Sequence, residues 1–339
     1  MTMTDNPVNE DFLLVADPFR RELLAHCYRM LGSVHDAEDL VQETYLRAWR
    51  SYDGFEGRSS LRTWLHRIAT RACLTALESR SRRPLPTGLG GPSSDPADTL
   101  VEQPEVPWLE PIPDAMVGAG QTDPAAIVAS RESIRLALIA ALQHLPPRQR
   151  AVLILRDVLN WRAAEVAEVV GTTTTAVNSI LQRARAQLHQ VAPSEDEVVE
   201  PNAPDQRELL ARYVRAFENY DVAAIVELFT ADAVWEMPPF TGWYQGADNI
   251  GRLIAAQCPA EGPGDLRLVP AEANGQPAFA MYLREDKEGT DGIHRAFALH
   301  VLTLSASGIA HVAVFFDLSL FATFGLPETQ PAQPQRLAR

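Results

Sequence analysis

The chain has 339 residues, of which 46% are hydrophobic, and a formal net charge of −14. This length suits two or three domains, and the composition is that of a globular chain rather than a disordered one. No apolar run approaches the ~20 residues that span a membrane, and the polar N-terminus does not resemble a secretory signal. Three scattered cysteines argue against a disulfide framework or a structural zinc site. We therefore expect a cytoplasmic protein with no metal, no cofactor and no membrane contact.

The acidic charge is unevenly distributed along the chain, which matters for nucleic-acid binding. Residues 127–192 carry eight basic and four acidic side chains, whereas residues 84–126 carry seven acidic and no basic ones. All but one of the 30 basic residues are arginines. Arginine suits bidentate contacts with phosphates and base edges, although GC-rich codon usage produces the same bias. Local charge rather than net charge therefore has to decide whether the chain binds DNA.

Residues 12–83 read as packed helices with almost no proline. In the block DAEDLVQETYLRAW, Val41, Tyr45, Ala48 and Trp49 recur at the spacing of one apolar helix face, and acidic side chains lie on another face. A second block, SSLRTWLHRIATRACL, carries arginines that can face a DNA backbone, and the loop SYDGFEGRSS lies between the two blocks. The pattern predicts an all-α domain with acidic and basic surfaces.

Residues 84–126 change character, because they are rich in proline, glycine and acid, and we interpret them as a linker. Helical periodicity resumes at 127–190, and a second acidic, proline-bearing stretch at 191–205 predicts another linker. Residues 206–326 then pass from helical runs into alternating segments typical of strands. A disordered tail is expected over 327–339.

The segment 127–190 contains the pattern of a helix-turn-helix. Leu145 and a double proline separate two helices, a short helix is expected from Arg162 to Val170, and Gly171 can take the positive φ that ends it. One of the four threonines that follow can cap the next helix. The second helix of such a motif enters the major groove of DNA by its N-terminal end, although an ordinary helical hairpin with a solvated polar face would show a similar pattern.

The two blocks and the helix-turn-helix carry a family resemblance. DAEDLVQETYLRAW and SSLRTWLHRIATRACL are similar to the promoter-melting domain (region 2) of bacterial sigma factors of the extracytoplasmic-function type, and the helix-turn-helix is similar to their region 4. The resemblance covers residues 12–83 and 127–190. It implies an alternative sigma factor that binds core RNA polymerase, directs it to promoter DNA and helps to melt the −10 element.

The same resemblance implies which residues make these contacts. The acidic helix of region 2 would dock on the clamp coiled coil of the largest polymerase subunit, although a solvated face with internal pairs such as Glu43 with Arg47 is the alternative. The next helix and its preceding loop would hold single-stranded −10 DNA, which calls for cations and stacking surfaces; for Trp64 a core position is the alternative. The implied polymerase-binding residues are Asp36, Asp39, Leu40, Gln42 and Glu43, and the implied −10 residues are Arg58, Arg62, Trp64, Arg67 and Arg71.

In region 4 the resemblance places the −35 contact at the start of the second helix, where threonine hydroxyls suit phosphates and Asn, Gln and Arg suit base edges. The sequence departs from the family at three positions. Asn178 and Ile180 stand where the family often has a basic residue, and Arg71 stands where it often has a shorter polar residue. We therefore expect a weak −35 contact, with region 2 providing most of the promoter discrimination. The implied −35 residues are Thr173, Thr174, Thr175, Asn178, Ser179, Gln182 and Arg183.

Residues 206–326 resemble the SnoaL-like polyketide cyclase and ketosteroid isomerase superfamily, whose fold is a curved sheet wrapped around helices. The whole chain is similar to the extracytoplasmic-function groups that carry a fused SnoaL-like extension, in part through PWLEPIPD (107–114) and NGQPAF (274–279). In those groups the extension regulates the sigma domains in cis, which implies an intramolecular contact and leaves open an unknown small ligand of the cone. The candidates for a regulatory pocket are Trp235, Glu236, Trp243, His294 and His300.

The predicted fold is therefore multidomain, with two all-α sigma domains, the second a helix-turn-helix, followed by an α+β SnoaL-like cone. The predicted function is a transcription initiation factor with no catalytic residue of its own. Two alternatives remain: a one-component helix-turn-helix regulator with a ligand-sensing cone, and a SnoaL-like enzyme with a DNA-binding appendage. The DAEDLVQETYLRAW and RTWLHRIA blocks speak against the first alternative, because a repressor needs no separate unit for docking on polymerase and melting DNA.

Overall fold

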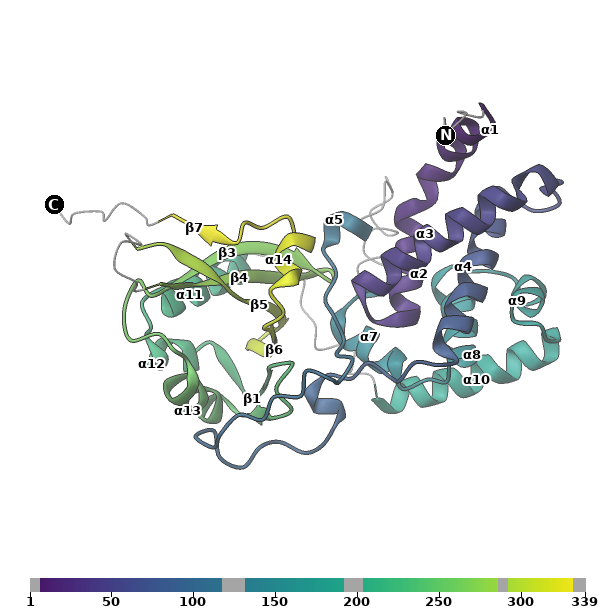
Figure 1. The fold of residues 1–339 in the computed structure, drawn as a ribbon. Helices are drawn as coiled ribbons and strands as arrows, with labels where there is room; N and C mark the ends of the chain where they lie inside the picture. Colours follow the sequence, from purple (N-terminus) through teal and green to yellow (C-terminus); the bar gives the residue numbers. More distant parts are fainter. Residues whose placement is uncertain (1–6, 118–131, 192–203, 286–291, 332–339) are drawn as a thin grey trace. The chain divides into compact units, whose positions relative to one another are not determined.

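The computed structural model of the chain describes residues 7–117, 132–191, 204–285 and 292–331 (Figure 1). The chain forms two compact units, which we call the helical unit and the C-terminal unit. The helical unit consists of residues up to Arg83 together with Leu109–Pro193, and the C-terminal unit consists of Pro84–Trp108 together with Ser194–Arg339. None of the helices in the described ranges is long and apolar enough to cross a membrane. Most of the expected second linker (192–203) and of the expected tail (332–339) lies outside the described residues.

The first half of the helical unit is built from three long helices that pack on one another. α2 ends at Gly32, whose φ of 71° is the left-handed value that glycine adopts easily. Ser33 then caps α3 by accepting a hydrogen bond from the Asp36 N–H. Leu23, Val41 and Leu65 are fully buried where the helices meet. The elements are α1 (Pro7–Ala16), η1 (Asp17–Phe19), α2 (Arg20–Leu31), α3 (Val34–Ser51), η2 (Tyr52–Gly54) and α4 (Leu61–Leu77).

The second half contains the predicted helix-turn-helix. Gly171 has a φ of 65° and ends the first helix of the motif, and the Thr173 hydroxyl accepts a hydrogen bond of 3.2 Å from the Ala176 N–H at the start of the second. Both the glycine turn and the threonine cap are thus confirmed. The elements are α5 (Asp114–Val117), α7 (Leu136–Gln143), α8 (Pro147–Leu153), a π-helical turn η4 (Ile154–Val158), α9 (Ala163–Val170) and α10 (Thr174–Val191).

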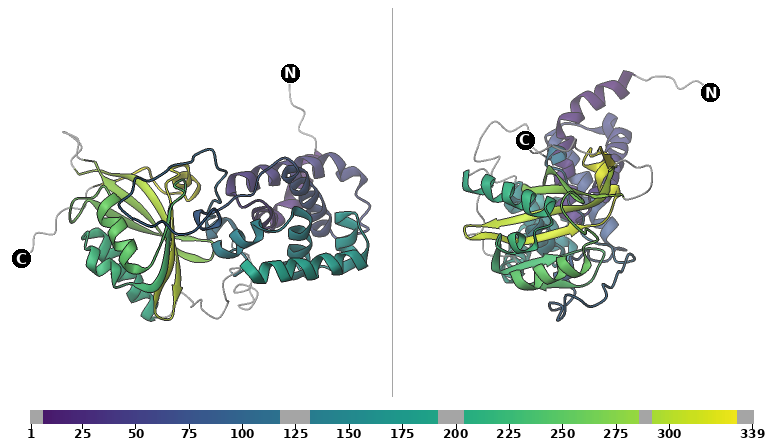
Figure 2. Two further views of the ribbon diagram at one scale, coloured as in Figure 1. Left: turned by 90° about the horizontal axis from the view of Figure 1, so that it is seen from below. Right: turned by 90° about the vertical axis from the view of Figure 1, so that its left-hand side faces the viewer.

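The C-terminal unit is a mixed sheet with helices, as expected for an α+β fold (Figure 2). The strand order is β2-β1-β6-β5-β4-β3, with β7 on β5; β1 and β6 run parallel and the other neighbours are antiparallel. The helices are α11 (Pro204–Glu218), α12 (Val222–Val226), α13 (Ala247–Gln257) and α14 (Ser319–Thr323), and the strands are β1 (Phe229–Glu236), β2 (Trp243–Gln245), β3 (Leu266–Ala273), β4 (Gln276–Arg284), β5 (His294–Ser305), β6 (Gly308–Phe315) and β7 (Thr329–Gln330).

The two faces of this sheet carry different partners. On one face, Leu302 and its neighbours on the sheet pack with Tyr213 and Phe217 of α11 and with apolar side chains of α12 and α13 in one buried core. On the other face, Phe321 of α14 meets the ring of Tyr282 edge-on at a centroid distance of 5.3 Å. The alternation of β5 in sequence therefore corresponds to the two sides of a sheet that is covered on both.

Two expectations about irregular segments need correction. Residues 84–108, expected to be part of a linker, fold onto the C-terminal unit and include the short helix η3 (Pro86–Gly88); we call this segment the strap. Thr329 and Gln330, expected in the disordered tail, pair as β7 with the start of β5. In both cases the backbone obtains hydrogen bonds from a distant sheet, which local composition does not reveal.

Candidate polymerase- and promoter-binding sites

The acidic helix α3 exposes only part of the predicted polymerase-binding set. Asp39 and Gln42 are exposed, whereas Leu40 and Glu43 are half-buried. Glu43 forms an ion pair of 2.6 Å with Arg47 one turn later, which is the internal pairing that the sequence left open. The structure thus brings Asp39, Leu40, Gln42 and Glu43 onto one side of the helix, and their role in binding stays a prediction.

Asp36 stands apart from this surface. Its carboxylate lies 2.5 Å from the guanidinium groups of both Arg80 and Arg83, which follow α4. Arg83 in turn contacts Glu110, whose carboxylate accepts hydrogen bonds from the Ser33 hydroxyl at 2.8 Å and the Val34 N–H at 3.1 Å. Glu110 therefore adds a negative charge at the N-terminus of α3. Asp36 and Glu110 tie segments of the helical unit together, a role that neither residue's sequence context indicated.

The outer face of α3 also carries apolar side chains that sequence reasoning did not place there. The spacing placed Trp49 on one apolar face with Val41 and Ala48; 41% of Trp49 is exposed, however, and Leu46 is 47% exposed. On a helix, Gln42 and Leu46 lie one turn apart, so the two apolar side chains continue the surface that begins at Asp39. Exposed apolar groups beside charged ones are typical of a protein-binding surface.

The predicted −10 arginines are all engaged within the helical unit. Arg58 pairs with Glu56, and Arg62 forms a forked contact with Glu22. Arg67 lies 2.8 Å from the carboxylate of Glu168. All five members of the predicted set lie on α4 or in the loop before it, as the sequence predicted.

Arg71 reaches the same end of α9 as Arg67 does. Its guanidinium donates long hydrogen bonds to the backbone carbonyl oxygens of Glu168, at 3.3 Å, and Val169, at 3.5 Å. These carbonyl groups belong to the last turn of α9, where a cation is favoured by the helix dipole. Two of the predicted DNA-binding cations are thus held by the second half of the helical unit.

Trp64 belongs to an aromatic group with two rings from the preceding loop. Its ring centroid lies 4.8 Å from that of Phe55 and 6.4 Å from that of Tyr52. All three rings are half-buried. Such a group offers ring faces on which an unstacked base can lie. Tyr52 and Phe55 were missed as individual residues, although the loop SYDGFEGRSS that contains them had been singled out.

The predicted −35 residues share one accessible surface on α10 and the turn before it. The set of three threonines with Asn178, Ser179, Gln182 and Arg183 is exposed throughout. Val177 and Leu181 lie on the opposite, buried side of the same helix. Arg185 is different, because it forms a forked ion pair of 2.7 and 2.9 Å with Asp157. The arrangement is that of a helix-turn-helix with a free polar face on its second helix.

Sequence comparisons decide the family. Residues 16–83 match Sigma-70 region 2, residues 135–188 match Sigma-70 region 4, and residues 210–311 match the SnoaL-like domain. The chain is 62% identical over 320 residues to the ECF RNA polymerase sigma factor SigG of Mycobacterium tuberculosis. This match covers 94% of this chain and 85% of that protein. The chain belongs to the ECF sigma factors.

Two further similarities concern a second sigma factor of the same organism. The chain is 32% identical over 306 residues to the ECF RNA polymerase sigma factor SigJ of Mycobacterium tuberculosis, covering 85% of this chain and 86% of that protein. The crystal structure of SigJ matches with a TM-score of 0.60 and 24% identity, covering 93% of this chain and 100% of that one. The predicted fold of two helical sigma regions and an α+β SnoaL-like domain is therefore confirmed.

Regions 2 and 4 of this sigma factor are joined by two buried arginines. Arg29 of α2 donates to the hydroxyl of Ser133 at 2.6 Å and to its carbonyl oxygen at 3.2 Å. Arg150 of α8 donates to the backbone carbonyl of Met30 and to three acceptors of its own region. Burial lowers the pKa of each arginine to about 10, so that both stay charged at neutral pH. The two regions pack as one unit through these contacts.

Two buried histidines lie beside Arg29 in region 2. The His26 and His66 rings are 5.4 Å apart, both are fully buried, and the carboxylate of Glu22 and the guanidinium of Arg62 face His66. Burial lowers the pKa of both rings below the usual 6.5; for His26 the neighbouring charges lower it further, and for His66 the Glu22 carboxylate opposes part of the effect. Both histidines are therefore neutral in the folded protein at neutral pH.

We expect region 2 to lose stability as the pH falls below about 6.5. The pKa of each histidine is lower in the folded than in the unfolded protein, so the unfolded chain binds more protons below about pH 6.5. The contribution of the two histidines to stability is therefore complete above this pH and decreases as the pH is lowered. Two histidines would account for about 1.5–3 kcal/mol between pH 7.5 and 5.5. Calorimetry at both pH values measures the stability that each protein loses between pH 7.5 and 5.5. The variant with both His26 and His66 replaced by glutamine should lose less than the wild type, and the exposed His189→Gln control should lose as much as the wild type. If the double variant loses as much stability as the wild type, His26 and His66 are not the cause of the pH dependence.

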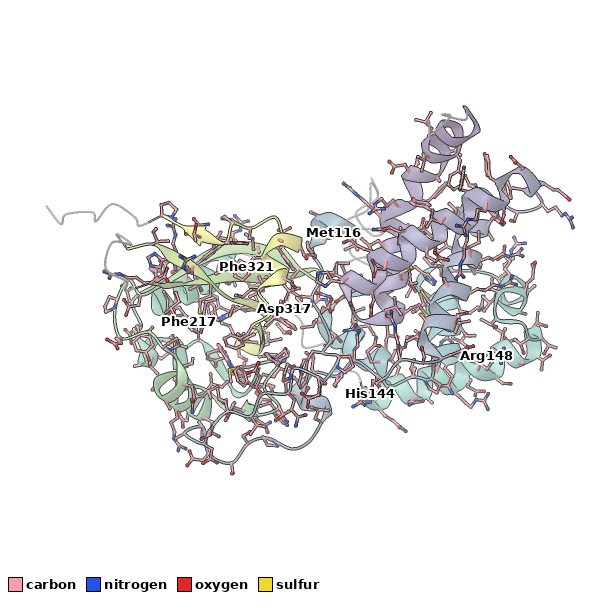
Figure 3. All side chains as sticks on the ribbon, viewed as in Figure 1. Met116, His144, Arg148, Phe217, Asp317 and Phe321 are labelled. Atoms are coloured by element: carbon pink, nitrogen blue, oxygen red, sulfur yellow. The ribbon has the colours of Figure 1, made fainter. Side chains whose placement is uncertain are left out.

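In the SnoaL-like domain, two of the five pocket candidates lie in an aromatic core. Nδ1 of the His300 ring shares a hydrogen bond of 2.7 Å with the Tyr213 hydroxyl. The rings of Trp235 and Phe217 lie edge-on to the His300 ring. Phe217 is labelled in Figure 3. Burial lowers the pKa of His300 to about 3, so the ring is neutral. The ring centroids lie 4.6–6.3 Å apart, so these rings pack on one another as part of the core. A ligand at this place stays a prediction.

The other three candidates lie elsewhere, so the structure does not assemble one pocket from all five. His294 contacts the carbonyl oxygen of Gly264 at 2.8 Å. Glu236 is 1% exposed and accepts a hydrogen bond of 2.8 Å from His311 and one of 2.9 Å from the Thr87 N–H of the strap. Trp243 donates to the Gly90 carbonyl of the strap at 2.9 Å. The strap occupies the side of the domain on which Glu236 and Trp243 lie, and the role of these three residues in a regulatory pocket stays a prediction.

The strap is held along its length by the SnoaL-like domain. Its backbone bonds to the loop between β1 and β2, where the Gln103 N–H donates to Pro239 at 2.9 Å and the Val101 carbonyl accepts from Thr241 at 3.0 Å. Nearer its middle, Asp95 pairs with Arg252 of α13 at 2.9 Å. The first part of the segment that connects regions 2 and 4 in sequence, residues 84–108, is therefore a structural part of the C-terminal unit.

Proposed function

We propose that this ECF sigma factor docks on core RNA polymerase through the exposed side of α3, namely Asp39, Gln42, Leu46 and Trp49. The observation that carries the proposal is the combination of two exposed polar residues with two exposed large apolar ones on a helix whose other side is buried. Such a surface is unfavourable in water unless a partner covers it. A factor that acts on RNA polymerase works in the cytoplasm.

Promoter DNA is contacted at two places. The free polar face of α10 suits the major groove of the −35 element, and its lone arginine, Arg183, agrees with a weak contact. The aromatic group of Tyr52, Phe55 and Trp64 suits unstacked bases of the −10 element. These features support an assignment in which region 2 provides most of the discrimination.

The SnoaL-like domain regulates the sigma regions in cis. Support comes from the strap, because this first part of the segment between regions 2 and 4 is bonded to the SnoaL-like domain at Glu236, Trp243 and Arg252. A rearrangement of the two regions that extends the strap itself has to break those bonds first. The domain thereby restrains the sigma regions without a catalytic step.

Asp39→Arg is expected to weaken the complex with core RNA polymerase at least about tenfold, because a charge reversal within an interface costs more than 1.4 kcal/mol. The affinity is measured by titrating labelled full-length protein with core polymerase. Glu78→Arg, an exposed carboxylate at the end of α4, serves as a control with the same change in charge. Equal affinity of the Asp39 variant and the wild type would remove α3 as the docking helix.

A further inference from the structure

His66, one of the two buried histidines of region 2, lies against a tryptophan of region 4. The ring centroids of His66 and Trp161 are 6.0 Å apart, and both side chains are buried. Trp161 lies between η4 and α9, where its N–H donates to the Leu155 carbonyl oxygen at 2.9 Å and its own carbonyl oxygen accepts from Arg156. Region 4 therefore fixes the Trp161 backbone and supplies one wall of the site in which His66 is buried.

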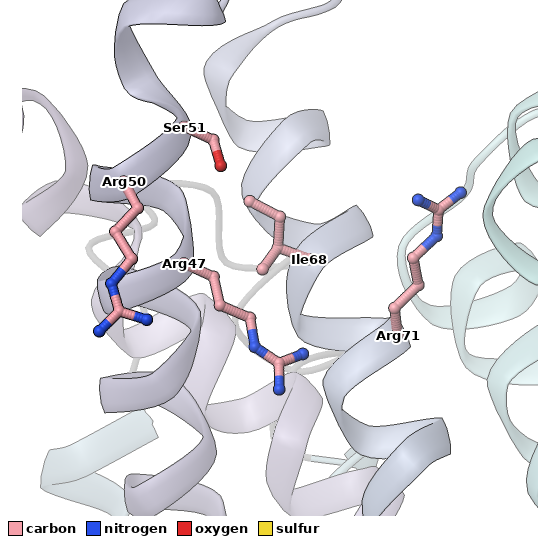
Figure 4. A pocket seen from close by; sticks show the side chains of 5 residues that line it. All are labelled: Arg47, Arg50, Ser51, Ile68 and Arg71. Carbon is pink, nitrogen blue, oxygen red and sulfur yellow. The ribbon is translucent and has the colours of Figure 1, made fainter.

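The same interface continues along α4 beyond His66. Arg67 pairs with Glu168 of α9 at 2.8 Å, and Arg71 donates to carbonyl oxygens in the last turn of α9. In Figure 4 the Arg71 side chain is accordingly directed toward the helices of region 4. Because Trp161 lies two residues before α9, all of these contacts are lost when that part of region 4 moves away from α4.

The surroundings of His66 define where an added proton goes. Nδ1 lies 3.0 Å from the Arg62 carbonyl oxygen, which only accepts, so Nδ1 is assigned the hydrogen of the neutral ring. Nε2 is then the nitrogen with a free lone pair, and among the described residues it has no hydrogen-bond partner. The Glu22 carboxylate lies 3.7 Å from Nε2, beyond hydrogen-bond distance, and already accepts from the Arg62 guanidinium. A proton on Nε2 would have to share that carboxylate with Arg62.

The charged groups that face the two buried histidines are unfavourable to a further positive charge. They are Glu22 and Arg29 of α2 and Arg62 of α4, and region 4 adds the uncharged indole ring. The His26 ring lies 5.4 Å from the His66 ring. Two guanidinium groups and one carboxylate give one net positive charge, and a proton on His66 raises it to two. A buried charge without its own counter-ion is unfavourable until water reaches it, in agreement with the lowered pKa of His66.

We infer that His66 and Trp161 form an acid-sensitive switch between regions 2 and 4, which opens when His66 takes up a proton. The buried contacts of Arg29 and Arg150 hold the packed form at neutral pH. In acid, Trp161 leaves the histidine ring, water hydrates the imidazolium, and α9 moves away from α4. Because separation is linked to the uptake of one proton, the ratio of separated to packed protein rises by up to about tenfold for each unit by which the pH falls.

This inference deepens the proposed function and rests on it for the consequence of opening. Regions 2 and 4 have to reach two separate promoter elements, and Arg67 and Arg71 are engaged by α9 in the packed form. The switch would therefore raise the fraction of the factor whose two regions are free of each other. It is a device of the helical unit alone, because His66 and Trp161 both belong to that unit.

The test uses the full-length chain labelled with fluorotryptophan and followed by fluorine NMR from about pH 7.5 to about pH 5.5, on both sides of the ordinary histidine pKa of about 6.5. The Trp161 signal, assigned with Trp161→Phe, reports whether region 4 still covers His66. The Trp64 signal, assigned with Trp64→Phe, reports the folding of region 2, because this ring packs with other rings of that region. We expect a solvent-exposed Trp161 signal to grow as the pH falls, with the Trp64 signal unchanged. His66→Gln should remove most of this growth, since glutamine takes up no proton.

Two other histidines provide matched controls. His144 also joins the two regions, because its Nδ1 lies 2.9 Å from the Arg82 guanidinium, but it is half-buried and can be hydrated without separation. His189 is exposed on α10. His144→Gln and His189→Gln should both keep the acid response of the wild type. A response that is lost in His144→Gln and kept in His66→Gln belongs to the contact with Arg82 and overturns the inference.

The remaining outcomes are equally decisive. If the wild type shows no exposed Trp161 signal at low pH, or if the Trp64 and Trp161 signals change together, the switch is refuted, since acid then either leaves the regions packed or unfolds region 2. A variant that has lost its Trp64 signal at neutral pH has not folded, and His66→Met, which is neutral and adaptable in shape, then takes its place. Co-elution with core polymerase is measured separately: a wild-type chain that forms no holoenzyme contradicts the proposed function, and the Trp161 signal still decides about the switch.

Discussion

Replacing Arg150 by leucine is expected to lower the stability of the helical unit by about 3–5 kcal/mol, since each buried acceptor left unpaired costs about 1–3 kcal/mol. The Arg150 guanidinium serves the backbone carbonyls of Met30, Gln143 and Leu145 and the Gln143 side chain, the last at 2.7 Å. These carbonyls belong to the ends of α2 and α7, where helices leave acceptors without partners. Leucine fills part of the volume but satisfies none of them.

Hydrogen exchange of peptides from α2 and α7 measures this loss locally, which avoids treating a two-unit chain as two-state. Arg150→Lys keeps a positive charge with fewer donors and should fall between the wild type and the leucine variant. Arg183→Leu, exposed on α10, is the control and should change stability by less than about 0.5 kcal/mol. A loss below about 1 kcal/mol for Arg150→Leu would show that the carbonyls find other partners.

Thr87→Pro is expected to release the strap from the SnoaL-like domain and to increase holoenzyme formation. Proline has no N–H, so the bond of 2.9 Å to the buried Glu236 carboxylate is lost. A hydrogen bond to a charged group contributes about 1.5–3 kcal/mol, which corresponds to roughly a 10- to 150-fold shift in the docking equilibrium. If the domain restrains the sigma regions through the strap, a weaker strap raises the fraction of chain able to bind core polymerase.

Two measurements follow this change. Amide exchange of strap peptides reports release, and the amount of holoenzyme at a fixed core polymerase concentration reports its effect on function. Thr87→Ala keeps the N–H and removes only the side chain, so it should behave as the wild type in both. Faster exchange of the strap without more holoenzyme would separate the strap from regulation and contradict the proposed restraint.

Local patterns were sufficient for the helices and the helix-turn-helix. Gly171 and Thr173 could be placed because a left-handed glycine and a capping hydroxyl act on residues two to four positions away. The alternation along β5 predicted a strand for the same reason. The family resemblance then supplied the order of the domains, which periodicity alone does not provide.

The features that sequence reasoning missed depend on distant partners. Residues 84–108 look like a linker because proline, glycine and acid dominate them, yet their backbone is bonded to residues about 140 positions later, as Val101 is to Thr241. The roles of Arg150 and Glu110 cannot be predicted locally, because the buried carbonyls and the start of α3 that they contact come together only in the folded chain. Spacing alone placed Trp49 on the apolar face of its helix, and only packing shows that this side chain stays 41% exposed.

The strap also sets an order of events during synthesis. Region 2, the strap and region 4 all leave the ribosome before β1, β2 and α13, which hold the strap in the finished protein. At 5–20 residues per second, the remaining domain takes roughly ten seconds to appear. Every new chain therefore passes through an interval in which its sigma regions are complete and their connecting segment is still unbound. A polymerase present at the site of translation meets the factor in its least restrained form.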